Sequence, residues 1–157
     1  MSEKNSSFRQ EKNQLIYTRL VNAPCKLVWD AWTDPEQVKE WWGPAGFTLT
    51  HHSIDVRAGK EWVFTMHGPE MDFENRILFL EVKKPSLLHY KHTDPDGKIT
   101  FEVYATFEES EGKTLVTLRS IFESEEVIEE LNRQFRILEG GKQHLDNLEL
   151  YIDNLNK

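Results

Sequence analysis

Residues 28–44 read VWDAWTDPEQVKEWWGP and hold four of the five tryptophans of this 157-residue chain. Just before this stretch, Pro24 suits a first helical position, because its missing N–H would have no partner there. Asp34 can cap a second helix that begins at Pro35, with Gln37 placed to reach back as in a capping box. The closing Gly-Pro pair ends that helix, because proline cannot continue it. The stretch therefore predicts two short helices joined by a turn.

Segments on both sides of these helices alternate between apolar and polar residues, as expected for strands with one buried face. The clearest alternation lies between Lys60 and His67, where Trp62, Phe64 and Met66 share one face. Turn sequences rich in Gly, Pro, Asp and Ser separate most of the segments. The predicted strands are 15–21, 47–56, 60–67, 73–82, 87–93, 99–108 and 114–122. Seven strands joined mostly by short turns indicate an antiparallel meander.

The chain ends in a helical pattern from Glu125 to about Asn156, with an expected interruption near Gly140 and Gly141. Its apolar residues fall on one stripe, which must be buried. The stripe contains Leu138, Leu145, Leu148, Ile152 and Leu155. An antiparallel sheet with one apolar face is its natural partner. We expect an α+β fold in which a curved sheet of about seven strands wraps a long C-terminal helix.

The length of the chain suits one domain, and we expect it to span residues 14–157 after a flexible segment over 1–13. No apolar run approaches the ~20 residues that a membrane span needs, and the polar N-terminus lacks a hydrophobic signal core. A single cysteine, Cys25, excludes an internal disulfide and is typical of a reducing compartment. These features favour a cytoplasmic protein.

The formal net charge of −8 argues against a nucleic-acid partner, because such binding depends on clustered Lys and Arg. Much of the acid lies in residues 108–130, which hold eight glutamates against Lys113 and Arg119. A run of this kind is usually a solvated surface. The alternative is that this run forms a docking surface for a basic protein partner.

Two histidine pairs, His51-His52 and His89-x-x-His92, raise the question of a metal site. Neighbouring residues and residues three apart point to opposite faces of a strand, so neither pair can chelate one ion without distortion. The chain has no HExxH motif and no Cys/His cluster with zinc spacing. We therefore predict no metal and no cofactor.

The run APCKLVWDAWTDPEQVKEWWGP resembles the opening signature of bacterial proteins similar to the activator of heat shock protein 90 ATPase, within the START-like (SRPBCC) superfamily. Four further stretches of this chain resemble later blocks of that family. They are Asp55-x-Arg57-x-Gly59-x-x-Trp62, Met66-His67-Gly68-Pro69, Glu139-Gly140 and Leu145-Asp146-x-Leu148. The resemblance covers residues 14–156. It implies a helix-grip fold with a hydrophobic cavity between sheet and last helix, which the superfamily uses for apolar ligands. It implies no particular catalytic residue.

Our leading hypothesis is a cytosolic protein that binds a small apolar ligand, lipid-like or aromatic, in this cavity. Candidate ligand contacts are the inward-facing strand residues, the residues near one mouth, and the start of the closing helix. They are Trp41, Trp42, Phe47, Trp62, Phe64, Met66, Phe73, Phe79, Phe101, Gly141, His144, Leu145 and Leu148. A histidine such as His67, His92 or His144 could serve as a polar anchor, because apolar pockets commonly carry a few polar groups.

Where related sequences usually show Glu-Gly-Trp, this chain has Glu139-Gly140-Gly141. The missing ring suggests a roomier cavity at Gly141. The alternative is that the glycine pair marks a break between two helices, since glycine weakens a helix.

Two other functions stay open at this point. The first is a protein-interaction module, similar to the chaperone ATPase activator domain, that contacts a chaperone through the acidic run. The second is a cyclase-like or hydrolase-like cavity enzyme, with Asp72 and His67 as an acid–base pair at the cavity mouth. No GxSxG elbow or phosphate-binding loop supports catalysis, so a non-catalytic role is favoured. The sequence is also compatible with a homodimer.

Overall fold

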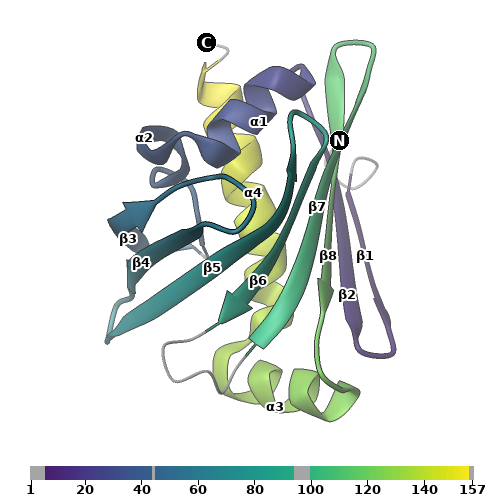
Figure 1. The fold of residues 1–157 in the computed structure, drawn as a ribbon. Helices are drawn as coiled ribbons and strands as arrows, with labels where there is room; N and C mark the ends of the chain where they lie inside the picture. Colours follow the sequence, from purple (N-terminus) through teal and green to yellow (C-terminus); the bar gives the residue numbers. More distant parts are fainter. Residues whose placement is uncertain (1–5, 44, 94–99, 156–157) are drawn as a thin grey trace.

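The computed structural model describes residues 6–43, 45–93 and 100–155, which form an eight-stranded antiparallel sheet curved around a long C-terminal helix (Figure 1). The strand order is β1-β2-β8-β7-β6-β5-β4-β3. The strands are β1 Ser6–Glu11, β2 Gln14–Val21, β3 Thr48–Ile54, β4 Glu61–His67, β5 Asp72–Lys83, β6 Leu87–Thr93, β7 Thr100–Ser110 and β8 Lys113–Ile121. The helices are α1 Cys25–Thr33, α2 Pro35–Val38, α3 Glu125–Phe135 and α4 Ile137–Leu155. This is the helix-grip α+β fold that the sequence predicts. One of the predicted turn sequences, DPDG at residues 94–97 between the strands predicted at 87–93 and 99–108, lies outside the described residues.

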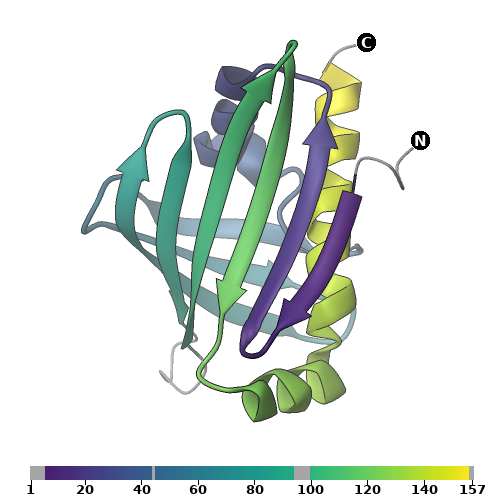
Figure 2. The ribbon, with the colours of Figure 1, turned by 90° about the vertical axis from the view of Figure 1, so that its right-hand side faces the viewer.

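Helix α4 runs along the concave side of the sheet, with α1 beside its C-terminal half and α3 at its N-terminal end (Figures 1 and 2). Arg19 of β2 joins this helix to the sheet. Its guanidinium lies 2.6 Å from Asp146 and 2.9 Å from Glu149, both on α4. Because Arg19 is only 4% exposed, these two ion pairs fix the helix across the buried face of β2. No helix in the part of the chain that the structure describes is long and apolar enough to cross a membrane.

The predicted pair of short helices forms as α1 and α2. Asp34 caps α2, and the side chain of Gln37 donates a hydrogen bond to the Asp34 carboxylate at 3.0 Å. Pro24 precedes α1 as its N-cap instead of occupying the first helical position. A carboxylate oxygen of Glu109, on β7, accepts the first free backbone N–H, that of Cys25, at 2.7 Å. A residue far along the chain thus supplies the cap that proline cannot.

Strand β1 differs from the prediction of a flexible segment over residues 1–13. Residues Ser6–Glu11 pair with β2 in antiparallel register. Within this pairing the ring of Phe8 lies against Tyr17, with centroids 4.8 Å apart. The strand was not recognisable from its sequence, SSFRQE, because one apolar residue gives no alternating pattern.

The break in the C-terminal helical region lies at Arg136, so the interruption predicted near Gly140 and Gly141 is wrong. Arg136 has φ 54° and ψ 49°, the left-handed conformation that ends α3. Both glycines lie inside α4. The side-chain oxygen of Asn132 accepts the backbone N–H of Leu138 at 3.1 Å, which helps to start the new helix. The glycine pair therefore needs another explanation.

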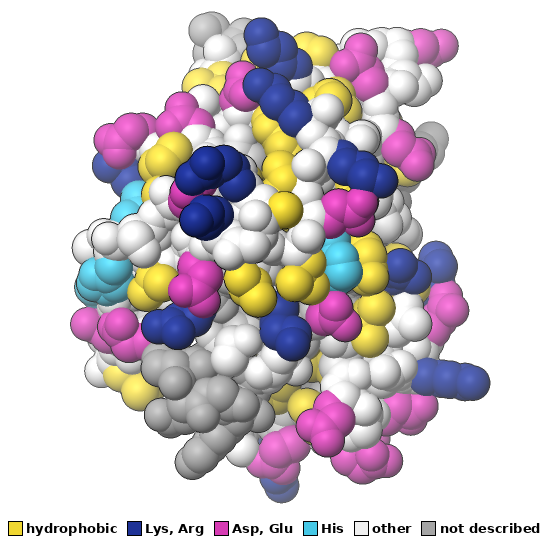
Figure 3. Space-filling view, viewed as in Figure 1, with side chains coloured by type: hydrophobic (Ala, Val, Ile, Leu, Met, Phe, Trp, Pro, Cys, Tyr) yellow, Lys and Arg dark blue, Asp and Glu magenta, His cyan; other side chains and the backbone are white. Residues whose placement is uncertain are grey.

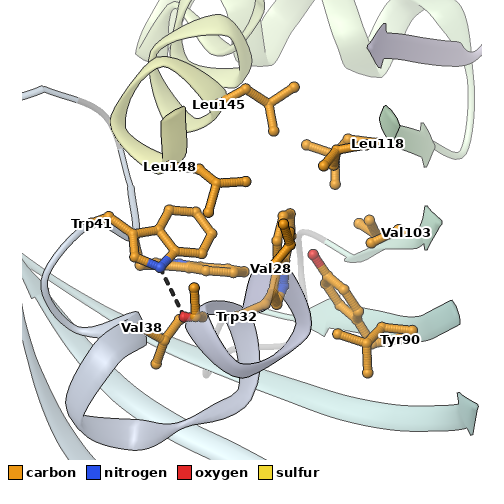
Figure 4. Packing of buried hydrophobic residues seen from close by; sticks show 14 of the residues in the cluster. Val28, Trp32, Val38, Trp41, Tyr90, Val103, Leu118, Leu145 and Leu148 are labelled. Atoms are coloured by element: carbon orange, nitrogen blue, oxygen red, sulfur yellow. Dashed lines mark hydrogen bonds between the residues drawn. The ribbon is translucent and has the colours of Figure 1, made fainter. Parts of the chain in front are cut away.

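Aromatic side chains fill the interior at the end of the sheet nearest α1 and α2. The ring centroid of Trp32 lies 5.0 Å from that of Trp41 and 5.4 Å from that of Phe107. Leu145 and Leu148 of α4 close over this cluster (Figure 4). Trp41 also donates a hydrogen bond from Nε1 to the carbonyl of Ala31 at 2.9 Å. The opposite end, toward α3, is less completely filled.

Candidate functional site

A cavity of about 690 Å³ lies between the sheet and the N-terminal half of α4. Most of its lining is apolar or aromatic: Leu15, Tyr17, Trp42, Gly43, Ala45, Phe47, Met66, Phe73, Tyr90, Phe101, Val103, Leu118, Phe122, Leu131, Phe135, Ile137, Gly140 and Gly141. The polar lining residues are Glu74, Asn75, His92, Ser120, Arg136, Glu139, Gln143 and His144. Small-molecule pockets typically measure about 300–1,000 Å³ and combine an apolar lining with a few polar groups. The cavity has the size and chemistry of such a pocket.

The sheet wall of the cavity follows from strand alternation and register. Tyr90 and His92 lie two residues apart on β6, and Phe101 and Val103 lie two apart on β7. Tyr90 pairs directly with Val103, and His92 with Phe101. Directly paired residues share a face of a sheet. The register therefore brings these four side chains together as one surface.

Tyr17 and Gly141 meet where α4 passes closest to β2. A Cβ built on residue 141 would lie 2.5 Å from Cζ of Tyr17 and 2.6 Å from its hydroxyl oxygen. That hydroxyl donates a hydrogen bond to the carbonyl of Leu138 at 2.7 Å. The Tyr17 ring thus takes up the space that Gly141 leaves. Close approach of helix and strand, and not an enlarged cavity, explains this glycine.

His144 lies at the end of the cavity nearest the tryptophans. Its ring centroid is 4.4 Å from that of Trp42 and 5.1 Å from that of Trp41. Burial, with a smaller contribution from the charge of His92, lowers the pKa of His144 to about 3. Its Nδ1 accepts the backbone N–H of Gly43 at 3.1 Å, so the neutral ring carries its proton on Nε2. Among the described residues, nothing hydrogen-bonds to that Nε2.

Two lining hydroxyls are also without a hydrogen-bond partner within the described ranges, those of Tyr90 and Ser120. Tyr90 is 3% exposed and Ser120 is 8% exposed. Figure 4 shows the Tyr90 hydroxyl pointing away from β6 into the interior, beside Val103. Burial raises the pKa of Tyr90 well above its ordinary value, so the hydroxyl keeps its proton. Both residues line the cavity, which makes these two hydroxyls available to a ligand.

Phenylalanines border the cavity where it approaches the surface. The ring centroid of Phe73 lies 6.0 Å from that of Phe47 and 6.2 Å from that of Phe135. Phe135, the last residue of α3, is 50% exposed. The charged residues of the lining are all exposed, and they are Glu74, Arg136 and Glu139. Within the described residues, the Asp, Glu and Arg side chains of the lining are therefore confined to the rim.

Seven of the thirteen residues that the sequence proposed as ligand contacts line this cavity: Trp42, Phe47, Met66, Phe73, Phe101, Gly141 and His144. The other six are buried outside it: Trp41, Trp62, Phe64, Phe79, Leu145 and Leu148. Aromatic packing accounts for much of this difference. The rings of Trp62 and Phe64 stack with centroids 4.1 Å apart, and Trp62 also packs against Trp42 at 4.8 Å. Trp62 and Phe64 therefore pack against neighbouring rings and do not line the cavity.

The lining residues that sequence reasoning missed include three that carry hydroxyls, Tyr17, Tyr90 and Ser120. Each lies two residues from a buried leucine on the same strand, namely Leu15, Leu88 and Leu118 respectively. The same alternation that indicated the inward aromatics could therefore have placed them on the inner face.

The histidine pairs bond to separate partners. The partners are Pro35 and Trp62 for His51, Thr65 for His52, Glu102 for His89 and Asn75 for His92. Within residues 6–43, 45–93 and 100–155, no group of three His, Cys, Asp or Glu side chains is placed to hold a metal ion.

The proposed acid–base pair forms, but not at the cavity. Nδ1 of His67 lies 3.0 Å from the carboxylate of Asp72, and Nε2 lies 2.8 Å from the hydroxyl of Thr50. Neither His67 nor Asp72 lines the cavity, whereas the preceding residue, Met66, does. The pair is therefore on the outer face of the sheet, and the expectation of a pair at the cavity mouth is wrong.

The acidic run over residues 108–130 divides between two places. Its first part lies at the tip of the β7–β8 hairpin and its second part lies in α3, at opposite ends of the sheet (Figure 1). Acidic and basic side chains are mixed over the face drawn in Figure 3. The run does not form one acidic surface.

The family model described as Activator of Hsp90 ATPase homolog 1-like protein matches residues 22–153. Among solved structures, a protein from Arthrobacter aurescens has a TM-score of 0.86 at 22% identity, covering 94% of this chain and 91% of that one. A protein from Staphylococcus epidermidis has a TM-score of 0.81 at 24% identity, covering 94% of both chains. Protein Ms6760 from Mycobacterium smegmatis has a TM-score of 0.81 at 21% identity, covering 96% of both. At these identities the likeness is one of fold. The comparison with curated proteins gave no match.

Proposed function

Because the chain belongs to the family of Activator of Hsp90 ATPase homolog 1-like proteins, we propose that it binds a small apolar molecule in its cavity. The observation that carries this proposal is the cavity of about 690 Å³ between the sheet and α4, with its mostly apolar lining. Apolar surface buried there gains ~25 cal/mol per Å². A ligand that buries roughly 300 Å² would gain about 7 kcal/mol before the costs of association are subtracted.

The two alternatives have less support from the geometry. Docking of a chaperone through the acidic run lacks a continuous acidic surface, because the run is divided between the β7–β8 hairpin and α3. Catalysis by His67 and Asp72 lacks a pocket, because the pair lies outside the cavity. The cavity is the feature that most resembles a binding site.

The test is native mass spectrometry of the gently purified protein, alone and after incubation with a panel of lipids and apolar metabolites. Leu118→Trp should fill the cavity, because Leu118 lines it and is 6% exposed. Leu115→Trp is the matched control, because Leu115 lies on the same strand and is 36% exposed. Circular dichroism would check that both variants fold, with Val103→Phe as a milder substitute.

We expect a mass above that of the bare chain in the wild-type protein and in Leu115→Trp, and its loss in Leu118→Trp. A bare wild-type chain throughout would contradict the proposal. A bound mass that survives in a folded Leu118→Trp protein would contradict the location of the site. Stimulation of a purified chaperone ATPase by a ligand-free protein would instead favour the interaction module.

A further inference from the structure

Away from the charged rim residues, the cavity lining contains polar groups without a partner in the described part of the chain, among them the Tyr90 hydroxyl, the Ser120 hydroxyl and Nε2 of His144. From them we infer that the ligand is a neutral molecule with a hydrogen-bond-accepting oxygen, such as a ketone or ester carbonyl, bound by the Tyr90 hydroxyl and the Nε2–H of His144. This inference rests on the proposed function of the cavity and narrows its ligand class.

Tyr90 carries the first part of the argument. Its side chain is 97% enclosed, and its hydroxyl points into the interior (Figure 4). Phenylalanine would supply the same ring to the cavity wall without a hydroxyl for which the described residues provide no partner. Tyr17, the other tyrosine of the lining, shows the ordinary solution, because its hydroxyl donates to the Leu138 carbonyl at 2.7 Å. The Tyr90 hydroxyl is the one that a bound molecule can satisfy.

His144 supplies a second donor. The backbone N–H of Gly43 occupies Nδ1 at 3.1 Å, which leaves the proton of the neutral ring on Nε2. Burial lowers the pKa of this histidine to about 3, so the ring stays neutral at physiological pH and donates one hydrogen bond from Nε2. Both groups are therefore proton donors toward a ligand, and an oxygen acceptor is the complementary chemistry.

The charge distribution argues for a neutral ligand. Among the described residues, the Asp, Glu, Lys and Arg members of the lining are Glu74, Arg136 and Glu139, and all three are exposed, so no lysine or arginine of the described inner wall offers a counter-ion. An ionised carboxylate carried into this interior would lose its hydration without gaining an ion pair. A carbonyl or ester oxygen needs only the hydrogen bond. The interior therefore selects against free acids.

The experiment compares three probes of one ring size by quenching of tryptophan fluorescence: 2-acetylnaphthalene, 2-ethylnaphthalene and 2-naphthoate. The variants are Tyr90→Phe, His144→Asn and the double variant. Asparagine at residue 144 can keep an acceptor for the Gly43 N–H while removing the distal donor. Tyr151→Phe is the matched control, because Tyr151 lies outside the cavity lining and its hydroxyl already bonds to Gln37 at 3.1 Å.

We expect the wild-type protein to bind both neutral probes, and 2-acetylnaphthalene to bind more tightly than 2-naphthoate. The double variant should bind the ketone at least about fivefold more weakly, which is the net worth of one hydrogen bond. The affinity of the double variant for 2-ethylnaphthalene should change by less than about twofold, because no ligand hydrogen bond is lost. The ratio of ketone to hydrocarbon affinity in Tyr151→Phe should change equally little, for the same reason.

Two results would overturn the ligand class while leaving the proposed function intact. One is an unchanged ratio of ketone to hydrocarbon affinity in the double variant. The other is tighter binding of 2-naphthoate than of 2-acetylnaphthalene, which would place an anionic group near Arg136. Failure of all three probes to bind the wild-type protein would overturn the proposed function itself, and the ligand class with it.

Discussion

The ring of Tyr17 occupies the space that a side chain on residue 141 would need, because a Cβ there would lie 2.5 Å from Cζ of Tyr17. The ring cannot easily move aside, since its hydroxyl is held by the carbonyl of Leu138 at 2.7 Å. Glycine inside a helix costs about 1 kcal/mol relative to alanine. The close contact between α4 and β2 offsets that cost.

Gly141→Ala should therefore destabilise the protein, although alanine favours helix. We expect a loss of about 1–3 kcal/mol in the free energy of unfolding, the usual cost of overpacking. Urea denaturation would measure it. A Tyr17→Leu background is the control, since removing the ring should make the same substitution neutral or stabilising. Stabilisation by Gly141→Ala in the native background would contradict the contact.

The two cavity tyrosines should respond differently to loss of the hydroxyl. Tyr17→Phe removes a hydrogen bond to Leu138 and should cost about 1 kcal/mol of stability. Tyr90→Phe removes a buried hydroxyl with no partner among the described residues, and should cost nothing or stabilise the protein. Thermal and urea unfolding of the two variants would measure both changes in stability. Equal losses would show that Tyr90 has a structural partner.

His144 should make the protein sensitive to acid. Its folded-state pKa is about 3, below the ordinary value of 6.5, so the unfolded chain binds the extra proton between these values. Stability should then fall as the pH falls from about 6.5 toward 3, by at most ~1.4 kcal/mol per pH unit from this group. Urea denaturation at pH 4 to 7 should show that the free energy of unfolding depends less steeply on pH in His144→Asn than in the wild-type protein. His67→Asn, at a partly exposed site, is the control. An unchanged pH dependence of the unfolding free energy in His144→Asn would count against a buried neutral ring.

Arg19 should contribute to stability through Asp146 and Glu149. Burial opposes ionisation of Asp146, but hydrogen bonds from Arg19 and Lys142 outweigh it and lower the pKa of this carboxyl. Its contribution is therefore present above the ordinary carboxyl pKa and is lost as the pH falls through the lower, folded-state value. Arg19→Met should cost about 1–3 kcal/mol near neutral pH, and less in strong acid.

Arg119→Met is the matched control for that measurement. Arg119 lies on β8, where its guanidinium stacks over the ring of Tyr104 at 4.8 Å. A single cation–π contact of this kind is worth about 0.5–1 kcal/mol at an exposed site. Equal losses of stability in Arg19→Met and Arg119→Met would mean that the ion pairs between Arg19 and α4 add nothing to the free energy of unfolding.

Much of the fold could be predicted because its elements carry strong local signals. Asp34 and Pro35 mark the start of α2, and alternation marks the strand with Trp62. Strand β1 carries no such signal, since its formation depends on backbone pairing with β2. The break at Arg136 also lacks a Gly or Pro signal, since a non-glycine residue adopts the left-handed conformation there, with its backbone N–H bonded to the carbonyl of Asn132.

The site was harder to predict than the fold, because alternation gives the face of a residue and not its depth along the sheet. Trp62 and Phe101 both point inward, but Trp62 packs against Trp42 and Phe64 while Phe101 faces the cavity. Where α4 and the sheet leave space depends on packing between distant segments. No local sequence pattern encodes the spacing between α4 and the sheet.

The most direct test of the binding site is an NMR experiment on isotope-labelled protein with 2-acetylnaphthalene. Nuclear Overhauser contacts from the probe should appear at the methyl groups of Val103 and Leu118, which line the cavity. The exposed methyls of Leu115 and Leu150 should show none. Contacts confined to these exposed leucines, or no contacts at saturating probe, would contradict the account of an internal ligand site.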